Sequence, residues 1–166
     1  MNFQDTQLIG VLARAESTVS SLSSLLGGLV EKFAARGYSL YLVGGSVRDA
    51  LLGRLGNDLD FTTPARPEVV KEILDEWAET VWDTGIDFGT VSAAYKGQQI
   101  EITTFRSDSY DGPSRNPEAV YGDTLEGDLV RRDFKANAMA IELLADASFK
   151  FHDPLHGLHD LSLIHI

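Results

Sequence analysis

Two aspartates separated by one leucine, Asp58 and Asp60, have the types and the spacing that suit metal chemistry. They belong to an alternation of acidic and apolar residues, Asp-Leu-Asp-Phe, that predicts a half-buried β-strand. Because side chains alternate along a strand, both carboxylates should project from one face. Neighbouring carboxylates repel unless a cation lies between them, and Mg²⁺ prefers carboxylates together with substrate phosphates. The pair therefore predicts a Mg²⁺ site, which Mn²⁺ could also fill, although two solvated acids on a surface strand would give the same pattern.

A pair of glycines, Gly44 and Gly45, lies between a short apolar run and the start of a predicted helix. Glycine lets the backbone approach a ligand closely and accepts a positive φ without steric cost. The N-terminus of a helix offers unpaired N–H groups and a partial positive charge. This strand–turn–helix unit, residues 39–52, directly precedes Asp58 in the chain. It therefore predicts a cradle for phosphate beside the metal site.

The elements that must position these residues follow from hydrophobic periodicity and from turn residues. Helical patterns cover residues 22–36, 46–52 and 67–77. Strand patterns cover residues 39–43, 58–61, 79–82, 90–95, 99–105 and 149–152, with a tight hairpin turn at 96–98. Residues 1–20 give only a weak helical pattern, residues 106–127 suggest an irregular loop, and residues 129–144 suggest a helix followed by a strand from about Met139. Short strands interleaved with helices indicate a mixed α/β or α+β domain.

Length and composition limit the classes of protein to consider. The chain has 166 residues and is 43% hydrophobic, which suits one globular domain. It contains no cysteine, which excludes disulfides and thiolate metal sites and fits a cytoplasmic location. Its apolar stretches fall short of the ~20 residues that a membrane span needs, so we expect no membrane partner. The net charge of −11, with only 14 lysines and arginines, leads us to expect that this chain does not hold RNA by itself.

Three separated motifs, in order, resemble the head domain of class II CCA-adding tRNA nucleotidyltransferases and the related bacterial poly(A) polymerases. They are GGSVRDALLGR from Gly44, DLD from Asp58, and RRDFKANAMA from Arg131. The resemblance implies an α+β fold of the nucleotidyltransferase (polymerase β-like) type, with a mixed or antiparallel sheet flanked by helices. It places the catalytic head at residues 29–161, after an N-terminal helical segment of residues 1–28. Residues 162–166 depart from the family and would be a tail, truncated or vector-derived, in place of the helical neck, body and tail domains.

The resemblance also implies an activity. The family transfers CMP and AMP from CTP and ATP to the 3′ end of tRNA without a template, by two-metal phosphoryl transfer. Poly(A) polymerases share the head motifs, and the motif that selects the base lies in the neck, so both activities stay open. An inactive nucleotide-binding module on the same fold is the alternative that is not an enzyme. Most tRNA contact would come from the domains beyond residue 166, so the isolated chain could be inactive, and its oligomeric state is left open.

A third carboxylate is expected to join the two aspartates. Glu101 alternates with Ile100 and Ile102, so its side chain should face away from theirs. The resemblance gives Glu101 the role of orienting the nucleophile, while Asp58 and Asp60 hold the metal. An exposed acid on an edge strand would be the structural alternative.

The resemblance implies a set of nucleotide-binding residues as well. Gly45 and Arg48 would meet the nucleotide, with Gly44 and Ser46 as secondary candidates, unless Arg48 forms a structural ion pair with Asp49 or Asp60. Arg132 would bind the triphosphate, and Asp133 would accept a hydrogen bond from a ribose hydroxyl. The irregular segment 106–127 matches a mobile loop of the family, or is a disordered insertion.

Overall fold

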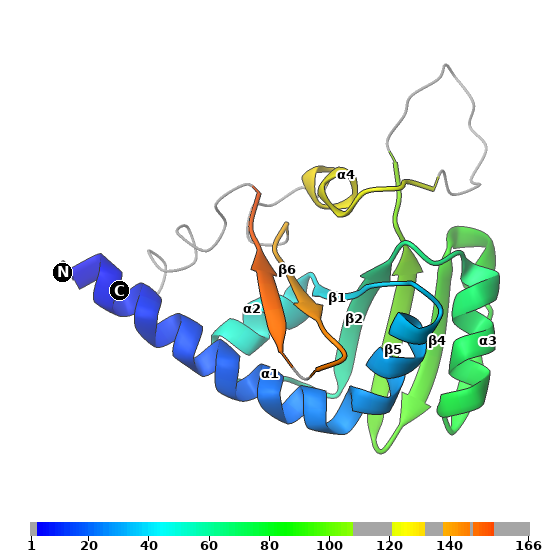
Figure 1. Ribbon diagram of the computed structural model, residues 1–166, viewed down its shortest axis with the longest axis horizontal. Coiled ribbons are helices and arrows are strands. Elements are labelled where there is room, and N and C mark those ends of the chain that lie inside the picture. The colour runs from blue at the N-terminus through cyan, green and yellow to red at the C-terminus, as the bar shows by residue number, and fades with distance from the viewer. Residues whose placement is uncertain (1–2, 108–120, 132–137, 147, 155–166) are drawn as a thin grey trace.

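The computed structural model describes residues 3–107, 121–131, 138–146 and 148–154. A seven-stranded sheet in the order β3-β4-β5-β2-β1-β6-β7 forms its centre (Figure 1). The strands are β1 (Leu40–Val43), β2 (Asp58–Thr63), β3 (Thr80–Trp82), β4 (Thr90–Tyr95), β5 (Gln98–Thr104), β6 (Ala140–Leu143) and β7 (Phe149–His152). The helices are α1 (Phe3–Ala35), α2 (Gly45–Leu51), α3 (Pro67–Trp77), the 3-10 helix η1 (Ile86–Phe88) and α4 (Leu125–Val130). Within the described strands, β2 and β5 pair in parallel and the other pairs are antiparallel, which confirms the predicted mixed sheet.

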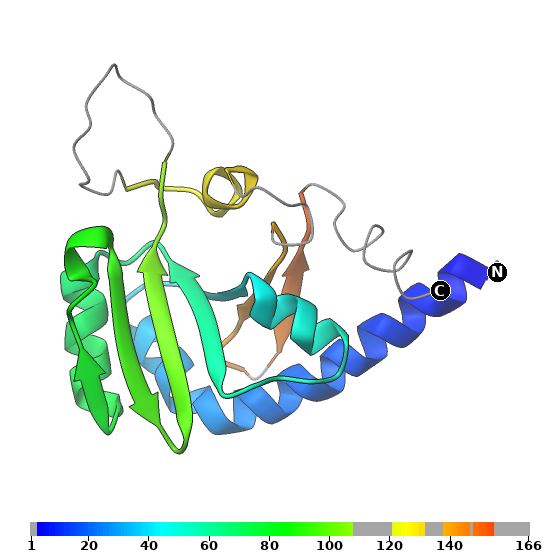
Figure 2. The same ribbon diagram turned by 180° about the vertical axis from the view of Figure 1, so that it is seen from behind.

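The main hydrophobic core lies between one face of the sheet and the helices α1, α2 and α3. Leu26 and Phe33 of α1, Leu51 of α2 and Leu74 of α3 are fully buried there, as is Ile102 of β5. Burying such side chains contributes roughly 1.5–3 kcal/mol each relative to leaving them exposed. In both views α1 runs along one side of the sheet and α4 lies at the opposite end (Figures 1 and 2). Helices α1, α2 and α3 therefore cover one face of the sheet and leave the other face for the polar residues.

A smaller apolar cluster attaches α4 to the other face of the sheet. Leu129 of α4 packs with Val43, Ala138 and Ala140. The helix begins after Thr124, whose hydroxyl accepts a hydrogen bond from the N–H of Gly127 at 3.1 Å. Such an N-cap satisfies one of the unpaired donors at a helix start. This helix begins inside the segment 106–127 that was predicted to be irregular, and Thr124 caps its start. The helix predicted from residue 129 falls mostly on residues 132–137, which lie outside the described residues, whereas the strand predicted from about Met139 is present as β6.

Helix α1 is longer than its hydrophobic pattern predicts. The expected helix over residues 22–36 is present, but it continues back to Phe3 and passes residue 28 without a break. The added stretch contains no proline, and Thr18 bonds its hydroxyl back to the carbonyl of Arg14 at 2.8 Å, as is common within helices. The helix ends at Ala35, and Gly37, two residues further on, has a φ of 82° that suits glycine. The division between residues 1–28, 29–161 and 162–166 stays a prediction.

The hairpin between β4 and β5 is tighter than expected. Its turn consists of Lys96 and Gly97, which have φ values of 46° and 79°. Two successive positive φ angles are typical of a two-residue type I′ turn, which matches the twist of the flanking strands. Gln98 consequently begins β5 instead of belonging to the turn.

Within the described residues, no helix has the length and apolar character needed to cross a membrane.

Candidate active site

The parallel pairing of β2 with β5 brings three carboxylates together. The register sets Asp60 opposite Glu101 and Asp58 opposite Gln99. All three acids are exposed, while their strand neighbours Leu59 and Ile100 are buried against the helices. The alternation predicted from the sequence therefore places Asp58, Asp60 and Glu101 on one open face. One cavity is lined by these three acids together with Leu59 and Gln99.

The electrostatics of this cavity show an excess of negative charge. The pKa of Glu101 is raised above its ordinary value, first by partial burial and then by the charge of Asp60. A hydrogen bond with Asp60 and the charge of Asp58 raise it further. Each of these effects disfavours a third negative charge at this position. A cation would relieve the repulsion, so the donor set fits a divalent metal.

The acids do not form a complete metal cage. Among the residues that the structure describes, no group of three or more His, Asp or Glu residues has the arrangement of a metal-binding cluster. Mg²⁺ is commonly held by one or two carboxylates, with waters and substrate phosphates as its other ligands. The arrangement therefore fits Asp58 and Asp60 as ligands that a substrate would complete.

Ser46 holds the glycine turn against the strand of aspartates. Its hydroxyl accepts a hydrogen bond from the N–H of Asp60 at 3.0 Å and lies 3.5 Å from the carbonyl oxygen of Asp58. The residue is only 6% exposed. The first turn of α2 is thereby fixed beside the two carboxylates, and the Ser46 hydroxyl is engaged with β2.

The glycine turn has the geometry that its residue types require. Gly44 has a φ of 66° and a ψ of −142°, a conformation that side chains other than glycine strongly resist. A Cβ on Gly45 would lie 3.6 Å from Nη2 of Arg48, so the guanidinium folds back over the turn. Arg48 is exposed, and the ion pairs formed by the described residues do not include it. The described residues thus do not show the structural ion pair of Arg48 with Asp49 or Asp60, and contact of Arg48 with a nucleotide stays a prediction.

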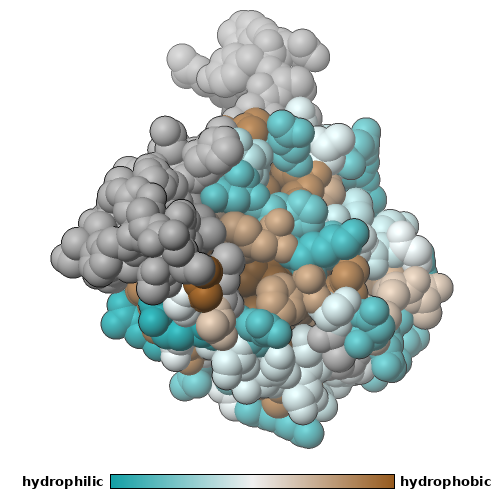
Figure 3. All heavy atoms as spheres, turned by 60° about the vertical axis from the view of Figure 1, so that its left-hand side comes forward, coloured by the Kyte–Doolittle hydropathy of each residue, from teal (hydrophilic) through white to brown (hydrophobic). Residues whose placement is uncertain are grey.

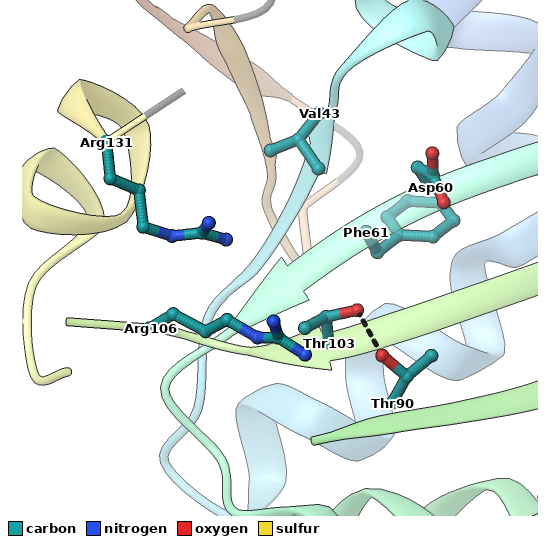
Figure 4. A pocket seen from close by; sticks show the side chains of 7 residues that line it. All are labelled: Val43, Asp60, Phe61, Thr90, Thr103, Arg106 and Arg131. Carbon is teal, nitrogen blue, oxygen red and sulfur yellow. Dashed lines mark hydrogen bonds between the residues drawn. The ribbon is translucent and has the colours of Figure 1, made fainter. Parts of the chain in front are cut away.

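A second cavity lies on the other side of Asp60 and contains residues that sequence reasoning missed. Its polar lining is formed by Asp60, Thr90, Thr103, Arg106 and Arg131 (Figure 4). The motif RRD pointed to Arg132 and Asp133, which lie outside the described residues. The first arginine of the RRD motif could have pointed to Arg131. The position of Arg106, directly after the predicted strand that carries Glu101, could have pointed to that residue.

On the molecular surface, apolar and hydrophilic residues gather in different places. The side view in Figure 3 shows hydrophilic residues bordering a patch of apolar ones. Among the described residues, the large apolar side chains that are exposed come from separate elements: Ile9, Trp82, Phe88 and Val130. The two cavities at Asp60 are lined mainly by charged groups and hydroxyls.

Comparisons with known proteins agree with this geometry. A family model described as the poly A polymerase head domain matches residues 40–166. A CCA-adding enzyme of Listeria innocua is 43% identical over 130 residues, which cover 78% of this chain and 31% of the relative. A CCA-adding enzyme of Lactobacillus helveticus is 45% identical over 126 residues, covering 75% of this chain and 30% of the relative. The chain thus spans about a third of the length of the curated relatives it matches.

Solved structures give the same answer at the level of the fold. The Bacillus stearothermophilus CCA-adding enzyme in complex with CTP is similar with a TM-score of 0.66 and 35% identity, over 84% of this chain and 31% of that one. A tRNA nucleotidyltransferase complexed with a primer tRNA and an incoming ATP analog is similar with a TM-score of 0.61 and 30% identity, over 86% of this chain and 36% of that one. With a family model that covers most of its length, and with this sheet and these carboxylates, the chain belongs to the poly A polymerase head domain family.

Proposed function

We propose that this chain is the catalytic head of a CCA-adding enzyme, a nucleotidyltransferase that adds CMP and AMP from CTP and ATP to the 3′ end of tRNA. The observation that carries the proposal is the parallel register of β2 and β5, which sets Glu101 beside the Asp58–Asp60 pair. The curated relatives named above, at 43% and 45% identity, support the choice of CCA addition within the family.

The carboxylates would work together on the attacking hydroxyl. Mg²⁺, or Mn²⁺ in its place, would be held by Asp58 and Asp60, and when bound it lowers the pKa of the attacking 3′-hydroxyl and neutralises developing phosphate charge. Glu101 would accept a hydrogen bond from that hydroxyl and so orient it. Ser46 keeps the turn and the strand in fixed relation through the N–H of Asp60. Such positioning and charge neutralisation account for most of the catalysis of phosphoryl transfer.

The nucleotide would lie over the glycine turn. Gly44 and Gly45 allow close approach of the triphosphate to the backbone, and Arg48 supplies a charged fork. Contacts of Arg132 with the triphosphate and of Asp133 with the ribose remain predictions from the motif. The tRNA would be held mostly by parts of the relatives that this chain does not span, as the net charge of −11 suggests. A cytoplasmic location belongs to the same proposal.

Calorimetry tests the proposal. Titration of CTP and ATP into the chain, with and without Mg²⁺, should show binding that requires the metal. The double variant Asp58→Asn, Asp60→Asn should lose that binding while keeping its fold. The matched control is Asp75→Asn, Glu76→Gln, which changes the net charge by the same amount on the exposed side of α3. Metal-dependent binding that survives in the Asp58, Asp60 variant would overturn the proposal.

Poly(A) addition is the second candidate, because the matching family model is described by poly A polymerase. Primer extension with single nucleotides separates the two activities. Incorporation of CMP when CTP is the sole nucleotide supports CCA addition, whereas repeated addition of AMP with ATP alone supports a poly(A) polymerase. The assay uses this head joined to the neck, body and tail domains of a relative, since the isolated head could be inactive. Binding of nucleotide without extension by that protein, with or without metal, would favour the inactive nucleotide-binding module.

A further inference from the structure

The second cavity at Asp60 has a polar lining that the proposed roles of Asp58, Asp60 and Glu101 leave unexplained. Arg106 and Arg131 extend into it from two different segments, the chain just after β5 and the residue that follows α4 (Figure 4). The hydroxyls of Thr90 and Thr103 lie on its other side and share a hydrogen bond of 2.9 Å. Since one of these hydroxyls donates to the other, the lining offers an oxyanion two guanidinium groups and one remaining hydroxyl proton.

Within the part of the chain that the structure describes, only one nitrogen of each guanidinium group donates a hydrogen bond that holds the group in place. Nη2 of Arg106 donates to the carbonyl of Phe88, and Nη2 of Arg131 donates to Asp128 at 3.4 Å. The Nε atoms of both arginines are buried and have no hydrogen-bond partner among the described residues. Buried donors without a partner are costly, and the few in a native protein require an explanation. A bound acceptor supplies one.

A buried carboxylate connects the two arginine-bearing segments. Asp128 is fully buried, and its Oδ1 accepts hydrogen bonds from the main-chain N–H of Arg106 at 2.9 Å and from Arg131. The same oxygen therefore sets the position of one arginine through its backbone and of the other through its side chain. Against two guanidinium charges, this acid leaves the arginine side of the cavity positive. Asp128 thus has the geometry of a positioning residue for the pair.

The cavity of the two arginines extends from Asp60 toward the C-terminal ends of β2 and β5. Along the parallel strands, Asp60 pairs with Glu101 and Thr62 with Thr103, and Arg106 follows the end of β5. The turn that carries Arg48 is instead held at Asp58 and Asp60 by Ser46. Asp60 lines both cavities, so the arginine pair shares a cavity with one of the carboxylates that would hold the metal.

We propose that Arg106 and Arg131, positioned by Asp128, form a phosphate-binding subsite that shares Asp60 with the carboxylate site. The forked Nε and Nη donors of arginine match two oxygens of one phosphate. The phosphate belongs either to the incoming nucleotide or to the last phosphodiester of the RNA that is extended. The inference rests on the proposed function, because a nucleotidyl transfer brings both of these phosphates to the metal-binding carboxylates.

Nitrogen-detected NMR of the arginine Nε–H groups tests the subsite in the unmodified chain. Pyrophosphate with Mg²⁺ is the first probe, followed by CTP with Mg²⁺ and by a short RNA that ends in CC. Arg106→Lys and Arg131→Lys assign the two signals, because lysine has no Nε–H fork. The signals of both arginines should shift on addition of a probe, and their exchange with water should slow. Signals that do not change with any probe would overturn the proposal.

Affinities of variants supply the second test and identify the source of the phosphate. Arg106→Gln and Arg131→Gln should each weaken binding by about tenfold or more, the value of a charged hydrogen bond. The control is Arg36→Gln, which removes an equal charge from an exposed ion pair with Glu72 at the end of α1. Weaker binding of CTP assigns the phosphate to the nucleotide, and weaker binding of the RNA assigns it to the primer. Equal affinity of variants and control for both ligands would overturn the proposal.

The same titrations separate failure of the subsite from failure of the proposed function. If the Asp58→Asn, Asp60→Asn variant loses metal-dependent CTP binding while the arginine variants retain it, the function stands and the subsite is wrong. If the arginine variants lose binding of pyrophosphate while the aspartate variant keeps metal-dependent binding of CTP, the subsite stands and the two-carboxylate function is wrong.

Discussion

The two faces of the sheet follow different rules. The face toward α1, α2 and α3 is apolar, and side chains such as Phe33, Leu51 and Ile102 are buried in one continuous core. The other face carries like charges beside each other at Asp60 and Glu101, and buried Nε donors of Arg106 and Arg131 that have no partner among the residues that the structure describes. Each of those features costs free energy in the absence of a ligand. The covered face thus supplies the stability that lets the open face keep a ligand site whose charges and donors are not compensated by the protein itself.

Removal of a large side chain from the covered face should have the largest effect on stability. Phe33→Ala empties a fully buried position between α1 and the sheet, so we expect the free energy of unfolding to fall by about 3–5 kcal/mol. Urea unfolding measures this loss, and nucleotide affinity of the folded protein should not change. Val130→Ala, at a position that is 47% exposed, is the control and should cost far less. Equal losses in the two variants would contradict the contrast between the faces.

The buried acid of the open face should come next. Asp128→Ala removes the acceptor of the Arg106 N–H and the partner of Arg131, which leaves a buried donor and a guanidinium uncompensated. We expect a loss of about 2–4 kcal/mol in urea unfolding. Asp123→Ala removes an acid whose side chain is 91% exposed and 3.5 Å from Arg66, and should cost under about 1 kcal/mol. If Asp128 cost no more than Asp123, its role in positioning the arginines would be wrong.

The contact between the glycine turn and β2 should have a smaller effect. Ser46→Ala leaves the N–H of Asp60 without its acceptor, for which we expect a loss of about 1–2 kcal/mol. Metal-dependent binding of CTP should weaken too, because the turn and the carboxylates are then no longer held together. Ser21→Ala, which removes an exposed hydroxyl on α1, should change neither quantity. A change in stability without any change in CTP affinity would show that the contact is only structural.

The smallest effect should come from charge on the open face, and it should depend on pH. The pKa of folded Glu101 is raised, so its contribution to stability is fully present below the pKa of the unfolded chain. That contribution is lost as the pH rises through the higher pKa of the folded state. Without metal, Glu101→Gln should therefore raise the melting temperature at neutral pH by about 1–3 °C, the effect of less than ~1 kcal/mol.

Thermal melts at several pH values check this sign. Glu126→Gln, at an exposed position in the first turn of α4, is the control and should not show a gain that grows between acidic and neutral pH. Addition of Mg²⁺ should reduce or reverse the gain of Glu101→Gln, because a cation compensates the carboxylates. A gain that is independent of both pH and metal would contradict the electrostatic account.

Local patterns predicted the covered face well. Helix α3 has the bounds that its apolar stripe and Pro67 indicated, and strand β2 begins at Asp58 as its alternation required. Both elements bury one face against the same core, so the spacing of their apolar residues is enough to predict the type of each element and where it begins. The first half of α1 gave only a weak helical pattern over residues 1–20, although the N-terminal segment was expected to be helical and Val19 is fully buried there.

The open face was predictable only where a motif marked it. Asp58, Asp60 and Glu101 were found because alternation along two strands places them on one side. Arg106 and Arg131 were not, because they meet through a register and a helix packing that join distant segments. No local spacing connects Arg106 with the residue after α4, whereas in the folded chain the carboxylate of Asp128 contacts both.

The parallel pairing of β2 with β5 has a consequence for how the protein folds. Neighbouring antiparallel strands can close through a short turn, but parallel strands need a long connection between them. Thr62 and Thr103 meet across this pairing although they are 41 residues apart, with α3, β3 and β4 between them. Closing a contact of such range is slow compared with forming a hairpin. Glu101 can thus join the two aspartates only after this long-range pairing has formed, so partly folded chains contain the aspartate pair before the three carboxylates are assembled.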